Sequence, residues 1–259
     1  MQVTLTDPVA RAFSAAAASY DHEASLQRAV GHELIRQLPE SLAVTGWLDL
    51  GCGTGYFCRQ LQNHHPQAQG LAVDIAPGML QQARTARPGP AYLCGDAQAL
   101  PLAAASVDLV FSSLALQWCA DFSMVLDEIY RVLKPGGICV FSSLASGTLH
   151  ELSVSWQQAC SQPRVNRFRS FARYRQLCGQ GPLQVDSLYC RPTLQHYPDV
   201  RSVNRHLKGI GAQHLQNGQR RGLLGRAAWQ RMQDAYEELR QPAGLPVTWQ
   251  VVYGVLRKV

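Results

Sequence analysis

Apolar and polar positions along the first 145 residues follow two alternating periods. Short apolar runs typical of strands lie at residues 47–50, 70–74, 91–94, 107–112 and 138–144. Between them, apolar positions recur at helical spacing near residues 56–64, 77–87 and 122–133. Continuous apolar strands that alternate with helices are typical of a parallel sheet covered on both faces. The pattern therefore predicts a doubly wound α/β fold.

The residues before the first strand predict one long helix over residues 11–38, which Pro39 ends. Its apolar stripe begins at Phe13 or Tyr20 and continues through Leu26, Val30, Leu34 and Leu38. Within the core, Asp121 is expected to cap the helix that starts at Phe122, and "LKPGG" at residues 133–137 is expected to stop it.

The alternating pattern weakens after Gly147. Two strand-like runs remain, at residues 183–196 and 247–256, and the second alternates as an antiparallel strand would. Helical segments are expected at residues 199–210 and 226–240. We expect residues 148–175 and 199–226 to cover a substrate.

Charge divides the chain into two unlike parts. Residues 1–163 carry 8 Lys and Arg against 13 Asp and Glu, a net charge of −5. Residues 164–259 carry 16 against 5, a net charge of +11. Such a basic half indicates an acidic partner, either a nucleic acid or an acidic protein, or else a solvated basic surface.

The eight cysteines form no CxxC pair and no zinc-finger spacing with histidine, so we find no metal site. Several, such as Cys94 and Cys139, fall in strand-like runs and are expected to be reduced core thiols. The first residues lack the apolar stretch of a signal peptide, and no window approaches 18 uninterrupted apolar residues. A cytoplasmic protein without a membrane span is the expectation.

The loop after the first strand, in "WLDLGCGTGYF", carries three glycines that allow a ligand to approach the backbone closely. A dinucleotide fingerprint would place a third glycine where this chain has Tyr56 or Cys58, and the G-K-[ST] of a Walker loop is absent. Asp49 inside the strand would repel a pyrophosphate but suits a ligand with a positive group. The loop is therefore not expected to cradle phosphates.

Two more carboxylates follow the next strands. Asp74 ends the second strand, where it can accept hydrogen bonds from both ribose hydroxyls. Asp96, in "GDA" at residues 95–97, can accept from an adenine amino group. Adenine, a free ribose, a cation and no phosphate together describe S-adenosylmethionine.

The chain here resembles the class I S-adenosylmethionine-dependent methyltransferases. The resemblance rests on "LDLGCGTGYF", "AVDIAPGML", "CGDAQALPLAAASVDLVFSS" and "VLKPGG", in that order and spacing. It implies a Rossmann-like fold with a seven-stranded mixed sheet in a single domain over residues 1–259. Residues 1–40 would form a helical lid, 46–145 the cofactor-binding core, 146–226 a helical insertion with one strand that covers the substrate, and 227–259 the last helix and strand.

The nature of the acceptor follows first from what is missing. The fourth strand lacks the Asn/Asp-Pro-Pro-aromatic motif of enzymes that methylate amino groups of nucleic acids, and no Pro-Cys marks a cytosine nucleophile. No obvious general base is found. A carboxylate, with a pKa of roughly 4, is already ionised and needs only alignment with the methyl donor and exclusion of water.

Segments outside the core sharpen the resemblance. "AAAASYDHEASLQRAVGHEL", "LALQWCAD", "GTLHELSVSWQ", "VNRF", "HLKGIGAQH" and the terminal "VVYGVL" are similar to the malonyl-acyl carrier protein O-methyltransferases of biotin synthesis. The resemblance implies methylation of the free carboxyl of a malonyl thioester, so that its chain can be elongated towards pimeloyl. The implied partner is an acidic acyl carrier protein, or coenzyme A carrying the same malonyl group.

Candidate site residues fall into three groups. Positioning of the acceptor, without a general base, is expected from Tyr20, Gln117 and Trp118. Cofactor contacts are expected from Gln27, Asp49, Gly51, Gly53, Gly55, Asp74, Ile75, Met79, Gly95, Asp96, Ala97, Ser112, Ser113, Leu114 and Gln117. Substrate contacts are expected from Tyr20, Trp118, Arg167 and Lys208.

Three alternatives stay open at this point. The chain could methylate another small molecule, a quinone precursor or a free dicarboxylic acid, with the same cofactor site. It could methylate RNA through its basic half, although no nucleic acid is our expectation. It could also bind a ligand in this fold without turnover.

Overall fold

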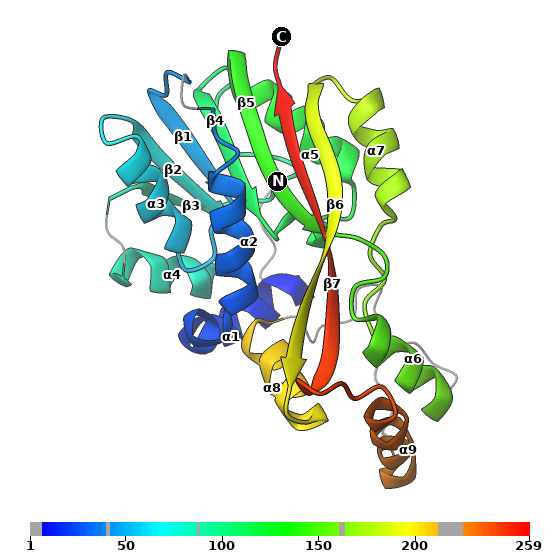
Figure 1. The fold of residues 1–259 in the computed structure, drawn as a ribbon. Helices are drawn as coiled ribbons and strands as arrows, with labels where there is room; N and C mark the ends of the chain where they lie inside the picture. Colours follow the sequence, from blue (N-terminus) through cyan, green and yellow to red (C-terminus); the bar gives the residue numbers. More distant parts are fainter. Residues whose placement is uncertain (1–6, 40–41, 87–88, 161–163, 212–224) are drawn as a thin grey trace.

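The computed structural model describes residues 7–39, 42–86, 89–160, 164–211 and 225–259. Within these residues, seven strands form one mixed sheet in the order β3-β2-β1-β4-β5-β7-β6 (Figure 1). The strands are β1 (Gly46–Leu50), β2 (Gln69–Asp74), β3 (Ala91–Cys94), β4 (Val107–Ser113), β5 (Leu133–Leu144), β6 (Gln184–Tyr197) and β7 (Leu245–Arg257). Strands β1 to β5 pair in parallel and β7 pairs antiparallel with both neighbours, which confirms the predicted seven-stranded mixed sheet.

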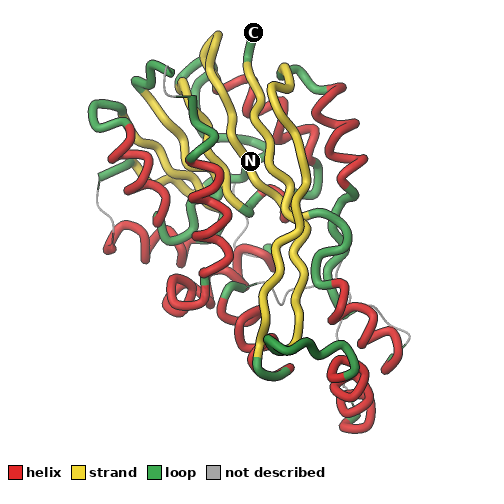
Figure 2. Tube along the Cα trace, viewed as in Figure 1, coloured by secondary structure: helices red, strands yellow, loops and turns green. Residues whose placement is uncertain are grey.

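Helices cover both faces of the sheet (Figure 2). They are α1 (Pro8–Glu23), α2 (Ser25–Ile35), α3 (Tyr56–His64), α4 (Pro77–Ala86), the 3-10 turn η1 (Leu116–Trp118), α5 (Phe122–Val132), α6 (His150–Ala159), α7 (Phe171–Gln180), α8 (Val200–Gly209) and α9 (Arg226–Glu237). One core lies between the sheet and α2, α3 and α4, and a second lies between the sheet and α5 and α7. Side chains of β1 divide between the two, because Trp47 faces the first core and Leu48 the second.

The α5 helix shows how local sequence produces this layer. The Asp121 carboxylate accepts hydrogen bonds from the backbone N–H groups of Ser123 and Met124, as its position before the helix predicts. Phe122, Val125 and Ile129 recur on one face and are buried against the sheet. The helix ends at Val132, directly before "LKPGG".

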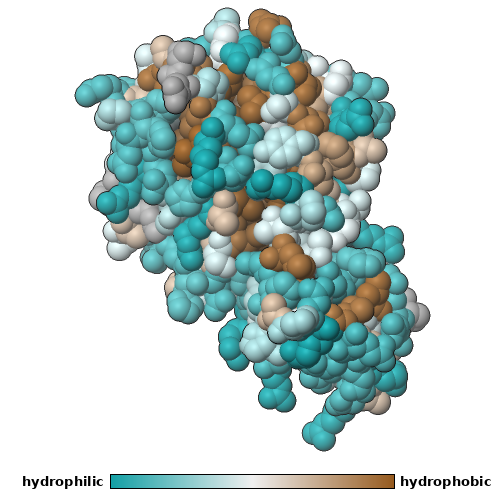
Figure 3. Space-filling model, in the orientation of Figure 1, coloured by the Kyte–Doolittle hydropathy of each residue, from teal (hydrophilic) through white to brown (hydrophobic). Residues whose placement is uncertain are grey.

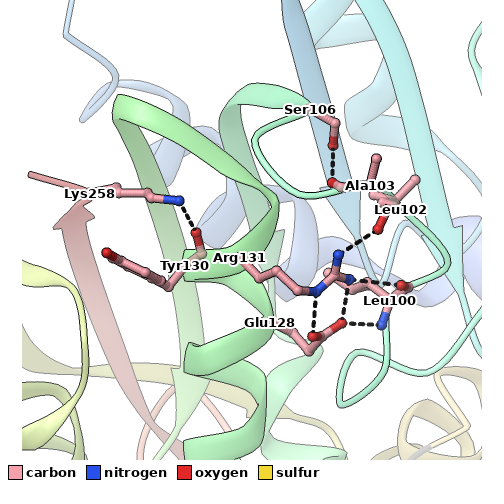
Figure 4. A network of polar contacts seen from close by, with 8 residues as sticks. All are labelled: Leu100, Leu102, Ala103, Ser106, Glu128, Tyr130, Arg131 and Lys258. Atoms are coloured by element: carbon pink, nitrogen blue, oxygen red, sulfur yellow. Dashed lines mark hydrogen bonds and ion pairs between the residues drawn. The ribbon is translucent and has the colours of Figure 1, made fainter.

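A polar network anchors the long loop between β3 and β4 to α5 (Figure 4). The Glu128 carboxylate accepts from the N–H of Leu100 at 2.6 Å and pairs with the Arg131 guanidinium. Arg131 in turn donates to the carbonyl oxygens of Leu102, at 2.6 Å, and Leu100, at 3.0 Å. The network therefore holds the loop that begins at Gly95 and carries Asp96.

Strands β6 and β7 extend well beyond the end of β5 (Figure 1). β7 pairs with β5 only from Val251 to Arg257, whereas its pairing with β6 continues to Leu245. Pro192 is tolerated in β6 because this strand forms the edge of the sheet. The extension brings Trp249 and helix α8, which packs against α1, to the end of the sheet where the parallel strands finish.

The structure corrects two expectations. The N-terminal segment forms two helices rather than one, because the backbone of Ala24 leaves the helical conformation and turns the chain. Cys94 is exposed, since β3 is the other edge strand, whereas Cys139 is fully buried as expected. Helix α7 begins near the end of residues 148–175, the segment that we expect to cover a substrate. It packs against α5 and β6, and its Tyr174 is buried.

The surface is mixed in character. In the view of Figure 3, polar side chains cover most of the face and apolar ones gather in limited patches. No helix among the described residues has the length and apolar content required to cross a membrane.

Close contact between β5 and β7 yields a test of the packing. A Cβ atom at Gly254 would lie 2.3 Å from Cε1 of the buried Phe141 ring. We predict that Gly254→Ala lowers the free energy of unfolding by about 1–3 kcal/mol, because the ring must shift in a filled core. Gly179→Ala is the matched control, since no atom lies within 4 Å of its added Cβ. Urea denaturation curves measure both, and equal stability of the two variants would contradict the packing described.

Candidate active site

The glycine loop lies where the order of the sheet reverses, between β1 and β4. Gly51, Gly53 and Gly55 all adopt positive φ angles, of 77°, 54° and 76°. This conformation strains residues with a side chain. At Gly51 space also matters, because an added Cβ would lie 2.2 Å from Cβ of Ala115. The three glycines of D-x-G-x-G-x-G are thus required by backbone geometry.

Asp74, at the end of β2, holds this loop. Its Oδ2 accepts from the N–H of Gly53 at 2.8 Å, and its Oδ1 accepts from the N–H of Ala76 at 2.8 Å. Burial raises the pKa of the Asp74 carboxyl, and the backbone donors oppose the shift. The same carboxylate faces a cavity, so loop position and ligand contact are coupled.

Asp49, inside β1, is the most deeply buried carboxylate of the site, with 2% of its surface exposed. The thiol of Cys58 donates to its Oδ2 over 3.2 Å. Burial raises the pKa of Asp49 to about 7, and the nearby charge of Asp74 adds to the shift. A buried carboxylate with so weak a donor is stabilised in its ionised form by a positive ligand.

The main cavity opens above these strand ends and contains about 940 Å³ of space not filled by protein atoms, some of it open to solvent. Many residues predicted for the site line it. They are Tyr20, Gly51, Gly53, Asp74, Ile75, Met79, Gly95, Asp96, Ala97, Ser113, Leu114 and Trp118. Their arrangement offers two carboxylates at strand ends with apolar side chains between them, which suits a flat ring attached to a hydroxylated group.

Two smaller cavities adjoin the main cavity. The inner cavity reaches Asp49 and Gln27 beside the glycine loop. The aromatic cavity is lined by Phe13, Tyr20, Leu26, Gln27, Leu114, Gln117, Trp118, Leu144, Leu149, Asn166, Phe168, Ile210 and Trp249. Tyr20 lines all three cavities, and it is therefore the side chain at which they meet.

Tyr20 is placed by helix α1, which is attached to the glycine loop. Asp21 follows Tyr20 in the chain, and its carboxylate accepts a hydrogen bond from the hydroxyl of Thr54, in the glycine loop, at 2.5 Å. Burial raises the pKa of the Tyr20 hydroxyl well above its usual range, and the charges of Asp74 and Asp21 reinforce the shift. The phenol therefore remains protonated and can donate a hydrogen bond to an anion.

Amide groups complete the polar part of the aromatic cavity. The Gln27 side-chain oxygen is buried without a hydrogen-bond partner among the described residues. Gln117 is held from the other side, because its Nε2 donates to the carbonyl of Leu114 at 2.5 Å and its Oε1 accepts from the Ser143 hydroxyl at 3.3 Å.

Four predicted residues lie apart from these cavities. The Ser112 hydroxyl is buried and donates to the carbonyl of Leu50 at 2.7 Å, within the sheet. Gly55 starts α3 and is packed against Tyr92. Arg167 lines a separate cavity beside α6, and Lys208 is exposed on α8.

Several residues of the aromatic cavity were not predicted. Phe13 packs edge-on against Trp118, with ring centroids 5.5 Å apart. Trp249 arrives from the extended part of β7, and its Nε1 donates to Gln195 at 3.0 Å. Leu114, which was predicted as a cofactor contact, has a positive φ of 49° directly after β4, held by hydrogen bonds from its N–H to Ser142. Apolar and polar residues alternate along the strand-like run that forms β7, and Trp249 falls on its inward face. This alternation is the one sequence signal that could have indicated that Trp249 lines a cavity.

Comparison with known proteins adds to the geometry. Residues 48–141 match the family model described as a methyltransferase domain. The chain is 43% identical over 251 residues to the biotin biosynthesis bifunctional protein BioHC of Cellvibrio japonicus, with 96% of this chain and 50% of that protein covered. The YcgJ protein from Bacillus subtilis resembles it in fold alone, with a TM-score of 0.56 at 15% identity over 89% of this chain and 97% of that one.

A second relative matches in length as well. The malonyl-[acyl-carrier protein] O-methyltransferase of Yersinia pestis is 41% identical over 251 residues, which cover 96% of this chain and 90% of that protein. The alignment thus includes the glycine loop, both strand-end carboxylates and the segments that form the aromatic cavity. This chain belongs to the malonyl-[acyl-carrier protein] O-methyltransferase family.

Proposed function

We propose that this protein transfers a methyl group from S-adenosylmethionine to the free carboxylate of a malonyl thioester carried by acyl carrier protein, an early step towards pimeloyl in biotin synthesis. The names of its relatives support the acceptor. The observation that carries the proposal is the chemistry of the aromatic cavity, whose described lining residues offer hydrogen-bond donors and apolar surface but no base.

The residues of the main and inner cavities fit the proposed cofactor. Asp74 would accept from the ribose hydroxyls and Asp96 from the adenine amino group, with Ile75 and Met79 against the ring. Asp49, buried and short of donors, would balance positive charge. S-adenosylmethionine supplies, when bound, a methyl group made electrophilic by a sulfonium.

The aromatic cavity suits an acceptor that is already ionised. Among its described lining residues, Tyr20 is the one titratable side chain, and its raised pKa keeps it protonated. No histidine, lysine or carboxylate occurs among the described residues of that wall, so none of these residues could remove a proton. A carboxylate needs no such removal, whereas a phenol with a pKa near 10 does, so the cavity favours a carboxylate over a quinone precursor.

The cavity would contribute to the rate by position and dehydration. The Tyr20 hydroxyl and the amides of Gln27 and Gln117 would orient the carboxylate through hydrogen bonds. Phe13, Trp118 and Trp249 would keep water away from its reacting oxygen. Alignment of this kind accounts for large rate effects in methyl transfer between bound partners.

The titration of Asp49 predicts how cofactor binding depends on pH. With a raised pKa of about 7, Asp49 is mostly ionised at pH 8 and mostly protonated at pH 6. We predict that the affinity for S-adenosylmethionine falls by up to about tenfold from pH 8 to pH 6, because only the ionised form attracts a cation. Calorimetry with methylthioadenosine, which is uncharged, should show no such fall. An unchanged pH dependence in Asp49→Asn would remove Asp49 from this role.

Tyr20→Phe tests the hydrogen bond to the acceptor. We predict a fall in kcat of about 10- to 100-fold with little change in cofactor affinity, since a donor to a charged group is lost. The matched control is Tyr189→Phe, which removes a hydroxyl from an exposed position on β6. Equal losses of turnover and cofactor affinity would make Tyr20 a cofactor contact only.

The reaction itself is tested by mass spectrometry. Malonyl-acyl carrier protein incubated with the enzyme and S-adenosylmethionine should gain one methyl group, and acetyl-acyl carrier protein should gain none, because it lacks the free carboxylate. Free malonate and malonyl-coenzyme A are tested in parallel. Methylation of free malonate but of neither thioester would replace the proposed acceptor with a free diacid.

A further inference from the structure

A fourth cavity, here called the arginine cavity, lies beside the aromatic cavity. It is bounded by α6 and by residues 164–168, and contains about 1030 Å³ of space not filled by protein atoms, some of it open to solvent. Asn166 and Phe168 line both cavities, so the two share a wall. The two cavities are therefore adjacent, with these two side chains between them.

Arg164 is the unusual group in this cavity. Its Nε and Nη1 atoms are buried, and neither has a hydrogen-bond partner among the described residues. The guanidinium lies over the Trp156 ring, 5.8 Å from the ring centroid. Stacking of this kind stabilises the cation but leaves its in-plane N–H groups unsatisfied. Burial of such donors is unfavourable unless an anion accepts from them.

The remaining wall favours an anion as well. Arg167, His150 and the hydroxyl-bearing Ser153 also line the arginine cavity, whereas no Asp or Glu belongs to its described lining. Glu151, the nearest acid in α6, is directed elsewhere, because its carboxylate accepts from the backbone N–H of Thr248 at 3.0 Å. The cavity thus combines positive charge with neutral donors, a composition that matches phosphate.

We propose that the arginine cavity binds the phosphate of the pantetheine arm that carries the acyl group, with Arg164 as its principal ligand. The inference rests on the proposed function, which places the malonyl carboxylate in the aromatic cavity. From there the thioester and its arm would pass Asn166 and Phe168 and bring the phosphate to Arg164. Acyl carrier protein and coenzyme A both supply this phosphorylated arm.

Kinetics with three malonyl thioesters test the assignment. Malonyl-acyl carrier protein and malonyl-coenzyme A carry the phosphate, whereas malonyl-N-acetylcysteamine does not. Arg164→Gln should raise KM by about 10- to 100-fold for the first two and leave KM for the third unchanged, with kcat preserved throughout. Arg175→Gln, which removes an exposed arginine of α7, is the control with the same loss of charge.

The thioesters for which Arg164→Gln raises KM distinguish the possible roles of Arg164. Equal losses on all three thioesters would overturn the proposal, because Arg164 would then act on the acyl end or on folding. A loss with the carrier protein alone would also overturn it, since Arg164 would contact the protein rather than the phosphate. Circular dichroism and Arg164→Lys, which retains the charge, identify a folding defect.

A binding measurement keeps the test independent of turnover. Calorimetry compares phosphopantetheine with pantetheine on the wild-type protein and on Arg164→Gln. The phosphate should increase affinity for the wild type and have no effect on the variant. Equal affinity of the two compounds for the wild type would refute the phosphate site. If no malonyl thioester is methylated, the proposed function fails. The comparison of phosphopantetheine with pantetheine would still show whether the arginine cavity binds phosphate.

Discussion

A buried carboxylate inside β1, close to a second carboxylate at the end of the adjacent β2, is the constraint on which the site depends. The charge of Asp74 raises the pKa of Asp49, and desolvation raises the pKa of both carboxyls. Asp74 is partly compensated by the N–H groups of Gly53 and Ala76, so the glycine loop takes its shape from the carboxylate. Asp49 has a thiol donor in place of such groups. A ligand that brings positive charge relieves this pair, whereas a phosphate would worsen it, which links the fold to the class of cofactor.

The aromatic cavity, which we propose as the acceptor site, is assembled from parts of the chain that are far apart in sequence. Helix α1 brings Tyr20, η1 brings Gln117 and Trp118, the segment after α6 brings Phe168, and the extended β7 brings Trp249. The parallel core alone could not enclose such a cavity, because its strands end at the glycine loop. The extra length of the β6–β7 pair carries Trp249 beyond the end of β5 and so supplies part of the wall of this cavity.

The core of this fold could be predicted because its signals are local. The apolar run of β1, the glycines after it and the Asp121 cap each depend on a few neighbouring residues. The break at Ala24 carries no glycine or proline, so the stripe of apolar positions appeared continuous across it. The positive φ of Leu114 depends on Ser142 in another strand. The direction of the Ser112 hydroxyl, which donates to the Leu50 carbonyl, is set by the partner strand and could not be predicted from its neighbours in sequence.

The basic half of the chain acquires a more specific meaning from the structure. Much of its charge serves the fold: Arg169 donates to the carbonyls of Cys119 and Ala120, Arg231 donates to that of Ala159, and Arg257 pairs with Asp186. Such residues still contribute to the long-range field that attracts an acidic partner, since a field depends on net charge and not on free donors. Retention of a bound ligand depends instead on donors without partners, which Arg164 has. The net charge of +11 would thus govern how fast a carrier arrives, and the buried Nε and Nη1 donors of Arg164 would govern how its arm is held.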